Sequence, residues 1–524
     1  MLEGINVVAT LGDVSVTVSS IVYDSRAVTP GALFVALPGL HVDGHDYLND
    51  ALKRGAAALV VERIAGEAAS ETEAAVPVAS EPTAPIKAVP VVQVENGRRA
   101  LSAISAAFYD HPSKSLTVIG VTGTDGKSST CAYIHQLLQG MGNKAGLLST
   151  VSVDRGNGLE DNPFRQSTPE APEVQRFLSE MLEAGLEYAV VEATSHGLSE
   201  KTNRLADIAF DVAVFTNLSH EHLEFHGSYE QYRFDKGNLF RAIESSAVGF
   251  GVVNAKDEEA DYFAAQTSKP VYRYGIDCGD CDLSAVDVEG DITGVRFTVQ
   301  SRAGKSQTEI SIPGTFQVEN ALAALLVATK VTKTEIAKCC SLVPEIRPVP
   351  GRMVQVSRHL PFSLFIDYAH TPGAFERVLP LLRRFTTGRL IAVFGSAGER
   401  DVEKREIQGS IAAKYADILV ITDEDPRQED AMSILQQIAE GARTQSPRRV
   451  SHGDIILIPD RKKAIHRALS LAKPKDTVVL LGKGHEKSMI YPDGPIPWNE
   501  QEAATDALRQ LGFGIHPIRP QEVS

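Results

Sequence analysis

Short apolar runs and helical patterns alternate along most of the chain, and this alternation predicts an α/β fold. The runs are rich in β-branched residues and end in Gly or polar residues, as the strands of a buried sheet do. Because helical patterns such as the one over 131–141 separate the strands, we expect largely parallel sheets with helices on their faces. The predicted strands lie at 21–23, 32–37, 57–61, 89–94, 116–121, 188–191, 212–215, 364–367, 390–394, 418–421 and 477–481.

The pattern restarts twice along the chain, which predicts three domains. A length of 524 residues gives the same number, since a domain averages roughly 150 residues. We predict a small N-terminal α/β domain over 1–113, a central parallel-sheet domain over 114–349 and a C-terminal Rossmann-like α/β domain over 350–524. Residues 66–87 are rich in Ala, Glu and Pro without apolar periodicity, so we predict an exposed insertion there.

The predicted strand at 116–121 leads into a turn with the composition of a phosphate-binding loop. Residues 122–130 read Thr-Gly-Thr-Asp-Gly-Lys-Ser-Ser-Thr, and glycines in such a turn let backbone N–H groups close around phosphate oxygens at a helix N-terminus. Lys127 can reach the terminal phosphates, and Ser128 can offer its hydroxyl to Mg²⁺. Val121 stands where the usual pattern has Gly, so the loop is a variant. An ordinary Gly-rich turn is the alternative, but packing gives no reason for the lysine and the hydroxyls.

Two further predicted strands end in polar clusters. Glu192 follows the run at 188–191, and the run at 212–215 is followed by Asn217 and by His222 in a His-Glu-His sequence. In open parallel sheets ligands gather beyond the carboxyl ends of the strands, where these residues and the phosphate loop would converge. A histidine in such a sequence is more often a polar loop residue, yet its place after a strand favours a ligand. We therefore predict that these polar clusters form one ligand-binding site.

Charge and hydropathy exclude several classes of protein. The net charge of −15 argues against a general nucleic-acid or anionic-membrane surface, because both need a basic face. The sequence has neither a run of about 18 apolar residues nor a basic N-terminus followed by an apolar core. We therefore expect a cytoplasmic protein without integral membrane contact.

The cysteines and two polar clusters have simple interpretations. Five cysteines, odd in number and scattered, suit a reducing compartment better than a disulfide framework. Cys278 and Cys281 have the spacing of half a zinc site, but no second pair completes it, so we predict a polar turn. The clusters Asp24-Ser25-Arg26 and Asp43-Gly44-His45 also have the composition of turns.

Over nearly its whole length the sequence resembles the Mur ligases, ATP-dependent enzymes that form amide bonds in peptidoglycan precursor synthesis. The phosphate loop, Glu192 with Ser195-His196, and Asn217 with His222 match motifs of that family. Within the family the chain is most similar to the ligases that add a diamino acid to UDP-MurNAc-L-Ala-D-Glu. This similarity is carried by Asp24-Ser25-Arg26, Pro30-Gly31, Asp43-Gly44-His45, Ser167-Thr168-Pro169, Asp367-Tyr368-Ala369-His370-Thr371-Pro372 and Gly482-Lys483-Gly484-His485-Glu486.

The resemblance implies a reaction, a cofactor and a set of site residues. ATP would activate a carboxylate as an acyl phosphate that a free amine attacks, and we expect a monomer. The implied cofactor is Mg²⁺, with Ser128, Glu192 and His222 as its ligands. The implied catalytic residues are Lys127, Glu192, His222 and a carbamylated Lys236. The implied ATP contacts are Gly123, Thr124, Asp125, Gly126, Lys127, Ser128, Ser129, Asn320, Arg352, Asp367 and His370. The implied UDP-substrate contacts are Ser25, Asp43, Gly44, His45, Ser167, Thr168, Thr194 and Arg204, and the implied amino-acid contacts are Arg400, Asp425, Arg427, Gly482 and Glu486.

The sequence departs from the family pattern at several positions. Gln317 stands where Asn is usual, Glu221 replaces an Asp, and Phe234-Asp235 replaces two alanines before Lys236. From spacing alone Lys236 would be a surface lysine at a helix end, and only the resemblance places it in the site. The usual Asp-Asn-Pro-Arg reads Glu424-Asp425-Pro426-Arg427.

The last departure bears on the amino acid that is added. Arg400 and Arg427 could bind the two carboxylates of meso-diaminopimelate. The acidic Glu424, Asp425, Glu429, Asp430 and Glu486 would instead suit the distal ammonium of L-lysine or L-ornithine. We expect a basic diamino acid, with these two ahead of meso-diaminopimelate. Two alternatives are a folylpolyglutamate-type ligase, which would lack the N-terminal uridine-nucleotide domain, and a nucleotide-binding paralogue without turnover.

Overall fold

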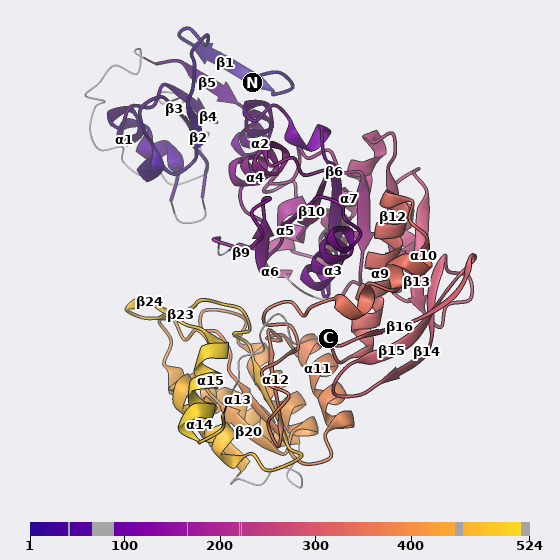
Figure 1. Ribbon diagram of the computed structural model, residues 1–524. Coiled ribbons are helices and arrows are strands. Elements are labelled where there is room, and N and C mark those ends of the chain that lie inside the picture. Colours follow the sequence, from indigo (N-terminus) through magenta and orange to yellow (C-terminus); the bar gives the residue numbers. More distant parts are fainter. Residues whose placement is uncertain are drawn as a thin grey trace. The chain divides into compact units, whose positions relative to one another are not determined.

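The computed structural model describes residues 1–39, 42–64, 89–164, 166–219, 221, 223–445 and 454–514. The chain forms two compact units, one of residues 1–127 and 138–272 and the other of residues 128–137 and 273–524. Helices alternate with largely parallel sheets in both units, so the predicted α/β class is confirmed (Figure 1). The predicted insertion at 66–87 lies outside the described residues.

The N-terminal part of the first unit is a small sheet with strand order β1-β5-β4-β3-β2. Strands β2 to β5 are parallel and β1 runs antiparallel to β5. Apolar side chains of these strands pack against α2 through Leu101 and Ile104, as an amphipathic helix covering a sheet requires. The elements are β1 (Val7–Leu11), β2 (Ser20–Val22), η1 (Ser25–Ala27), β3 (Ala32–Val35), η2 (Gly44–Tyr47), α1 (Leu48–Lys53), β4 (Ala58–Val61), β5 (Val91–Val94), α2 (Gly97–Phe108) and η4 (Pro112–Lys114).

The rest of the first unit is built on strands in the order β12-β11-β6-β10-β7-β8-β9, of which β12 to β7 are parallel. The register sets Glu192 of β10 and Val214 of β11 opposite the same residue, Val121 of β6. The carboxyl ends of these three strands therefore lie level, as predicted. The elements are β6 (Thr117–Thr122), α3 (Lys127–Gly140), β7 (Ala145–Leu148), β8 (Ser152–Asp154), β9 (Leu159–Asp161), α4 (Ala171–Glu183), β10 (Tyr188–Glu192), α5 (Ser195–Leu198), β11 (Val212–Phe215), α6 (Leu223–His226), α7 (Tyr229–Ala242), η5 (Ile243–Ser245), β12 (Phe250–Asn254) and α8 (Ala260–Ala264).

The second unit begins with strands that the sequence did not predict. Strands β14, β15 and β16 form an antiparallel meander, and the turn before β14 holds Cys278 and Cys281. The predicted turn is present, but its two cysteines are joined in a disulfide across a Cα–Cα distance of 5.5 Å, which the cysteine count did not predict. The elements are β13 (Val271–Ile276), β14 (Leu283–Gly290), β15 (Val295–Ser301), β16 (Gly304–Ile310), α9 (Thr315–Thr332), α10 (Ile336–Cys340) and η6 (Val343–Glu345).

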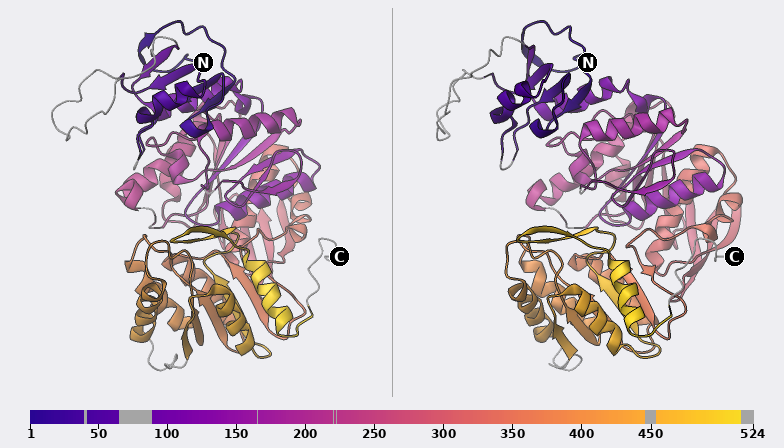
Figure 2. Two further views of the ribbon diagram at one scale, coloured as in Figure 1. Left: turned by 90° about the vertical axis from the view of Figure 1, so that its left-hand side faces the viewer. Right: turned by 60° about the vertical axis from the view of Figure 1, so that its left-hand side comes forward.

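The C-terminal part of the second unit is a sheet with strand order β17-β18-β22-β19-β20-β21, parallel except for β17. Its helices flank the strands (Figure 2, orange to yellow). The elements are β17 (Val354–Gln355), β18 (Ser363–Asp367), α11 (Pro372–Phe385), β19 (Leu390–Phe394), α12 (Glu403–Tyr415), β20 (Ile418–Ile421), α13 (Ala431–Gln445), β21 (Ile455–Leu457), α14 (Arg461–Leu471), β22 (Thr477–Leu481), β23 (Ser488–Tyr491), β24 (Gly494–Pro497) and α15 (Glu500–Gln510).

The start of one helix differs from the sequence prediction. The helix after the phosphate loop begins at Lys127 rather than at Cys131, because its first turn is polar and carries no apolar pattern. No helix in the described part of the chain is long and apolar enough to cross a membrane.

Candidate functional site

The turn between β6 and α3 is shaped by glycine and held by the segment after β11. Gly123 has a φ of 144°, and a Cβ there would lie 1.9 Å from Thr216 Oγ1, so only glycine fits. Thr216 Oγ1 donates to Asp125 O at 2.7 Å, and Asn217 Oδ1 accepts from Asp125 N at 2.9 Å. Thr124 N donates to Asn217 O at 2.8 Å. Residues 216–217 therefore hold the loop in shape without a ligand.

Two lysines converge on one carbonyl of this loop. Lys127 Nζ donates to Gly123 O at 3.0 Å, and Lys236 Nζ donates to the same oxygen at 2.5 Å. Lys236 is 1% exposed, and its Nζ lies 4.5 Å from the centre of the Tyr232 ring. The interpretation of Lys236 as a surface lysine is thus wrong, because it lies in the interior of α7 and faces the loop.

The environment of Lys236 disfavours its charged form. Burial, and after it the positive charge of Lys127, hold the pKa of Lys236 well below its ordinary value. The carboxylates of Glu221, Asp125 and Glu192 oppose this shift without reversing it. Lys236 is therefore a candidate neutral amine beside a phosphate loop, a chemical state that an exposed lysine does not reach at neutral pH.

The candidate metal ligands are oxygen donors near the same strand ends. Glu192 closes β10, is 3% exposed and accepts from Thr150 N at 2.8 Å. Ser128 is buried in the first turn of α3. A carboxylate and a hydroxyl suit Mg²⁺, which keeps several waters and is commonly completed by substrate phosphates. His222 lies outside the described residues, and within the ranges that are described no group of three or more His, Cys, Asp or Glu side chains is arranged to hold a metal.

A second group of predicted residues surrounds the start of α5. Thr194 caps this helix by accepting from Gly197 N at 3.1 Å, and its hydroxyl lies 2.8 Å from that of Thr168. A Cβ on Gly197 would lie 2.7 Å from Thr168 Cγ2, so glycine permits this close approach. Arg204 donates to Thr168 O at 3.1 Å and pairs with Glu170 at 2.7 Å, while its buried Nε has no partner in the described structure. Ser167, beside Thr168, is half-buried.

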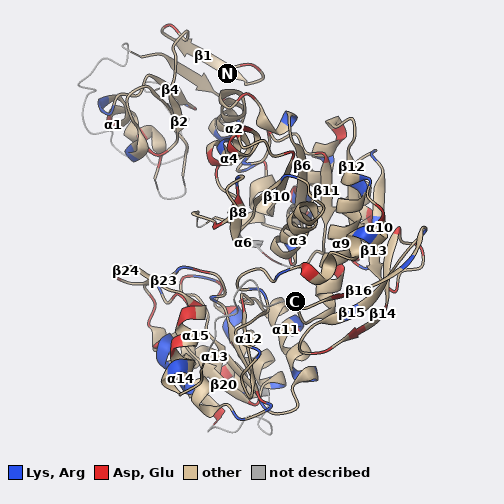
Figure 3. Cartoon of the chain, viewed as in Figure 1, with Lys and Arg blue, Asp and Glu red and all other residues tan. Residues whose placement is uncertain are grey.

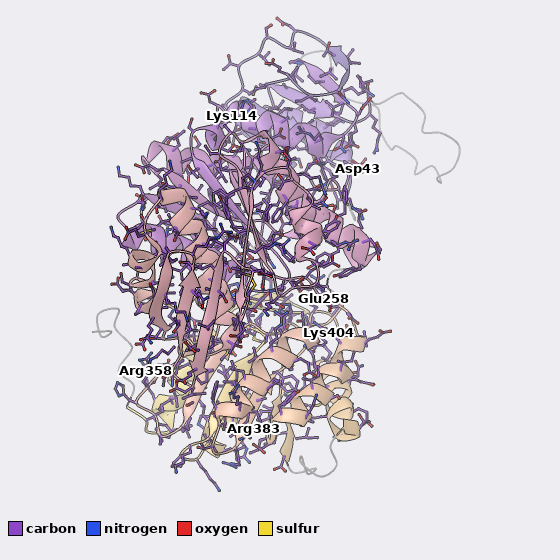
Figure 4. All side chains as sticks on the ribbon, turned by 90° about the vertical axis from the view of Figure 1, so that its right-hand side faces the viewer. Asp43, Lys114, Glu258, Arg358, Arg383 and Lys404 are labelled. Carbon is purple, nitrogen blue, oxygen red and sulfur yellow. A yellow bond between two sulfur atoms is a disulfide. The ribbon has the colours of Figure 1, made fainter. Side chains whose placement is uncertain are left out.

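The predicted residues of the N-terminal loops build those loops. Asp43 caps η2, accepts from His45 N at 2.9 Å and lies 2.6 Å from His45 Nδ1 (Figure 4 labels Asp43). His45 Nε2 accepts from Glu62 N at 3.0 Å, so both ring nitrogens are engaged. A Cβ on Gly44 would lie 2.8 Å from Leu37 N. Asp43 and His45 thus have the turn role that was predicted for their cluster. Ser25 is the first residue of η1, and Asp24 caps that helix.

Polar contacts join this N-terminal part to the rest of the first unit. Tyr23 OH donates to Glu173 Oε1 at 3.2 Å, and Arg99 forms an ion pair with Asp207. Burial raises the pKa of Glu173 and of Tyr23. The loops at Ser25 and the Thr168 cluster are therefore parts of one unit.

In the second unit Asn320 is bound to α3. Thr130 Oγ1 donates to Asn320 Oδ1 at 3.2 Å, and Tyr133 OH donates to Gln317 Oε1 at 2.7 Å. Gln317, the residue that replaces the usual Asn, thus holds α9 on α3 together with Asn320. Both residues are buried.

Arg352, Asp367 and His370 come together after β18. Asp367 accepts from Met353 N and from Ala369 N, each at 2.8 Å, and so fixes the backbone on both sides of the site. The Arg352 guanidinium lies 4.6 Å from the centre of the Tyr368 ring. His370 Nδ1 lies 2.9 Å from Tyr368 O. The carboxylate of Asp367 is therefore used mainly to shape the loop, and the guanidinium of Arg352 stacks at its surface.

The acidic residues predicted to bind the amino acid have cationic partners. Lys483 Nζ donates to Asp425 Oδ1 at 2.8 Å and also pairs with Glu486, and this lysine is fully buried. Arg405, equally buried, pairs with Glu429 at 2.9 Å. From the sequence, Asp425, Glu486 and Glu429 were all predicted to be available to a ligand. The two cations balance two of these three negative charges, so the acidity of the site is smaller than the sequence suggests.

Beyond the carboxyl ends of strands in the C-terminal sheet, several buried polar atoms lack partners in the described structure. They are Ser396 Oγ after β19, Glu424 Oε2 and Arg427 Nε after β20, and His485 Nδ1 after β22. A Cβ on Gly482, whose φ is 102°, would lie 2.8 Å from Glu424 Oε2. Burial lowers the pKa of His485 to about 3, so its ring is neutral. Unsatisfied polar atoms are costly to bury, and several at one sheet edge indicate a ligand site.

Several residues at these sites were not predicted from the sequence. Ser396 and Arg405 belong to this group, and the position of Ser396 at the end of a buried strand was the available signal. Arg461 is a further case, because its guanidinium donates to Asp423 O at 3.0 Å and to Leu481 O at 2.8 Å. It also pairs with Glu500 at 2.6 Å, joining basic α14 to acidic α15 (Figure 3). Arg461 thus ties together the ends of β20 and β22.

Sequence comparison matches three parts of the chain to known protein families. They are the Mur ligase family catalytic domain at residues 17–109, the Mur ligase middle domain at 121–328 and the Mur ligase glutamate ligase domain at 351–484. A UDP-N-acetylmuramyl-tripeptide synthetase of Roseiflexus sp. (strain RS-1) is 46% identical, over 95% of this chain and 96% of that protein. A UDP-N-acetylmuramoyl-L-alanyl-D-glutamate--2,6-diaminopimelate ligase of Caldanaerobacter subterraneus subsp. tengcongensis is 36% identical, over 95% of this chain and 96% of that protein.

The fold has the same relatives. A solved structure of a UDP-N-acetylmuramoyl-L-alanyl-D-glutamate--2,6-diaminopimelate ligase superposes with a TM-score of 0.62 and is 26% identical in sequence. The match covers 95% of this chain and 96% of that one.

Proposed function

The chain belongs to the Mur ligase family, and we propose from this premise that it adds a basic diamino acid to the D-Glu of UDP-MurNAc-L-Ala-D-Glu. It is an ATP-dependent amide ligase of peptidoglycan precursor synthesis. The observation that carries the residue assignment is the pair of lysines on Gly123 O beside the buried Glu192.

The reaction has two steps. A carboxylate oxygen of D-Glu attacks the γ-phosphorus of ATP, which gives an acyl phosphate and ADP. The amine of the diamino acid then attacks the acyl carbon, orthophosphate leaves, and the amine proton is released. Both steps bring polyanions together, so positive groups aimed at the phosphates are needed. We assign that role to Lys127 and to the backbone N–H groups of the loop other than those of Thr124 and Asp125, which donate to Asn217.

Mg²⁺ is the proposed cofactor, with Ser128, Glu192 and His222 as its proposed ligands. When bound it would supply countercharge and Lewis acidity at the phosphates. Ser128 is buried in the first turn of α3 and Glu192 is buried at the end of β10, and the oxygen donors of both fit this ion.

We propose that Lys236 works as a carbamate. Its neutral amine would attack the carbon of CO₂ and lose a proton, which leaves one negative charge and two oxygens on the side chain. The low pKa of Lys236 favours this reaction, because only the unprotonated amine is nucleophilic. A carbamate beside Lys127 would replace a repulsive contact with an attractive one.

The substrates are assigned to the other clusters. We place the uridine-nucleotide part at the loops of Ser25 and of residues 43–45, and the muramoyl dipeptide at Ser167, Thr168, Thr194 and Arg204. Asn320, Arg352, Asp367 and His370 are proposed to contact the nucleotide. In support, the buried Nε–H of Arg204 has no partner among the described residues and is available to a ligand.

We propose that L-lysine or L-ornithine is preferred over meso-diaminopimelate. Arg400 and Arg427 would hold the α-carboxylate, with Asp425, Gly482 and Glu486 around the chain of the amino acid. Lys483 and Arg405 pair with Asp425, Glu486 and Glu429, so we assign the distal ammonium to the buried Glu424, whose Oε2 has no partner among the described residues. Under this assignment the distal ammonium is recognised by one carboxylate rather than by a cluster of acids.

Product analysis tests the proposal. Purified protein is incubated with ATP, Mg²⁺, UDP-MurNAc-L-Ala-D-Glu and one of the three diamino acids, and products are identified by mass spectrometry. We expect a UDP-MurNAc-tripeptide with L-lysine or L-ornithine. The absence of tripeptide with every diamino acid would overturn the proposal, and tripeptide formed best with meso-diaminopimelate would overturn only the amino-acid assignment.

A further inference from the structure

A buried chain of three polar side chains lies beside the proposed dipeptide site. Asp235 Oδ2 lies 2.7 Å from His226 Nδ1, and His226 Nε2 lies 3.1 Å from Ser195 Oγ. The side chains of His226 and Asp235 are 0% and 1% exposed, and Ser195 is also buried. The carboxylate accepts from Nδ1–H, so Nε2 is free to accept the Ser195 hydroxyl proton. We call these three residues the Ser-His-Asp relay.

The relay is not placed to make Ser195 a nucleophile. Ser195 is the first residue of α5, directly after the cap Thr194, and it is enclosed by protein. A serine that attacks a substrate has to reach it. The hydrogen bond that Ser195 donates to His226 therefore has another consequence, which is to fix the position of the first turn of α5.

Other contacts support this role for α7 and its neighbour α6. Asn238 Nδ2 of α7 donates to Leu198 O, the last residue of α5, at 2.9 Å. Asp235 is itself held by Gln231, whose Nε2 donates to Oδ1 at 2.9 Å. The His226 ring packs between aromatic rings, with that of Tyr232 at 5.1 Å. Both ends of α5 are thus tied down, and the end that carries Thr194 depends on the relay.

The acid of the relay is a feature of this chain. Asp235 occupies one of the two positions before Lys236 at which the family pattern has alanine. Without it His226 would lack its Nδ1 acceptor, and its ring could turn or change tautomer. The substitution therefore strengthens a contact whose other end is next to Thr194 and, through the 2.8 Å hydroxyl contact, to Thr168.

We propose that Asp235 and His226 are positioning residues that hold Ser195, and through it the Thr168–Thr194 pair, in the geometry that binds the peptide of the UDP-substrate. This inference rests on the proposed function. It assigns to the relay the affinity for one of the three substrates, and no direct contact with any of them.

Steady-state kinetics of folded variants test the role. Asp235→Ala restores the usual family residue and should fold. We expect the KM for UDP-MurNAc-L-Ala-D-Glu to rise roughly tenfold, with the KM for ATP and for the diamino acid unchanged. His226→Phe, which keeps a ring in the aromatic cluster, should give the same change. His226→Gln can still reach Ser195 with its amide and should recover part of the loss.

Two further measurements distinguish the relay from general loss of structure. If the three residues act as a unit, Asp235→Ala should have little additional effect in a Ser195→Ala background, whereas independent structural effects would add. In ¹⁵N NMR spectra of labelled protein, His226 should be an Nδ1–H tautomer that changes in Asp235→Ala. Glu230→Ala, an exposed acid on the same helix, is the matched control and should keep all three KM values.

Each outcome has one reading. Unchanged KM for the UDP-substrate in Asp235→Ala and His226→Phe, equal increases for all three substrates, or additive effects in the double variant would each overturn the inference. Failure of the proposed function would look different, because the wild-type protein itself would then form no tripeptide.

Discussion

Buried titratable side chains determine much of the chemistry at the level of single residues. Lys236, Glu424 and Asp423 are all within the protein at strand ends or beside the phosphate loop. Burial disfavours the charged forms of Lys236 and Asp423, lowering the pKa of the first and raising that of the second. Substitutions at these residues should therefore show which of them act on a substrate and which affect only stability.

Lys236→Ala should reduce kcat by roughly 10²–10³-fold, the usual effect of removing one group that stabilises developing charge. The KM for the diamino acid should change little, because Lys236 lies at the phosphate loop. Lys236→Arg, which introduces a fixed positive charge and forms no carbamate, should be equally impaired. Full activity of either variant in a stopped phosphate-release assay would contradict the role given to this residue.

Asp423→Asn should change how stability depends on pH. Burial raises the pKa of Asp423 from 3.8 to about 6. The folded chain holds this proton more tightly than the unfolded one, so the stability it contributes is fully present below pH 3.8 and is lost as pH rises through about 6. The variant, which cannot ionise, should gain up to about 3 kcal/mol relative to the wild type between pH 4 and pH 7. Urea unfolding at intervals across this range measures the difference, and a constant difference would contradict the assignment.

Glu424→Gln tests the amino-acid assignment. Removing the charge should lower kcat/KM for L-lysine and L-ornithine by roughly 10–100-fold, as expected when a buried ammonium loses its carboxylate. Ser396→Ala, at the neighbouring strand end, removes a hydroxyl without changing the charge and should have a smaller effect. Equal kcat/KM values for the wild type and Glu424→Gln would show that the distal ammonium is recognised elsewhere.

At the level of elements, the proposed site residues lie in turns that follow parallel strands. Gly123→Ala should raise the KM for ATP at least tenfold, because the new Cβ would clash with Thr216 Oγ1, which supports the phosphate loop. It should also cost about 1–3 kcal/mol of stability through backbone strain. Gly142→Ala is the control, since Gly142 has a φ of 85° and open space around it. A normal KM for ATP in Gly123→Ala would mean that the loop does not bind the nucleotide.

Much of this element-level arrangement could be predicted from the sequence. The β-branched runs identified strands such as β6, β10, β19 and β22, and the rule that parallel strands end at one edge brought Glu192 to the phosphate loop. The antiparallel meander of β14 to β16 could not be found, because its exposed faces are polar and give no continuous apolar run.

The pairing of charged side chains is the second feature that could not be predicted from the sequence. The sequence shows that Lys483, Asp425 and Glu486 exist, but only the fold places one buried ammonium between two carboxylates. Likewise the spacing around Lys236 suggests a helix end, whereas the helix continues to Ala242 and turns the lysine inward. Strands and turns can be predicted from local sequence, whereas contacts between residues far apart in the sequence depend on the tertiary structure.

At the level of the whole molecule, a chain of net charge −15 has to bind two nucleotides, which are polyanions. Local positive charge, such as that of Lys127 at the phosphate loop, makes this feasible although the net charge of the molecule is negative. Because the proposed reaction consumes three substrates together, ATP cleavage should be coupled to amide formation. That coupling is the central claim.

The most direct test measures orthophosphate and UDP-MurNAc-tripeptide in the same reaction. With ATP, Mg²⁺, UDP-MurNAc-L-Ala-D-Glu and L-lysine or L-ornithine present, we predict equal amounts of the two products, little phosphate when any one substrate is omitted, and neither product with Lys127→Ala. Phosphate released at the full rate without the UDP-substrate or the amino acid, or no tripeptide under any condition, would contradict the assignment of this chain as a coupled ATP-dependent ligase.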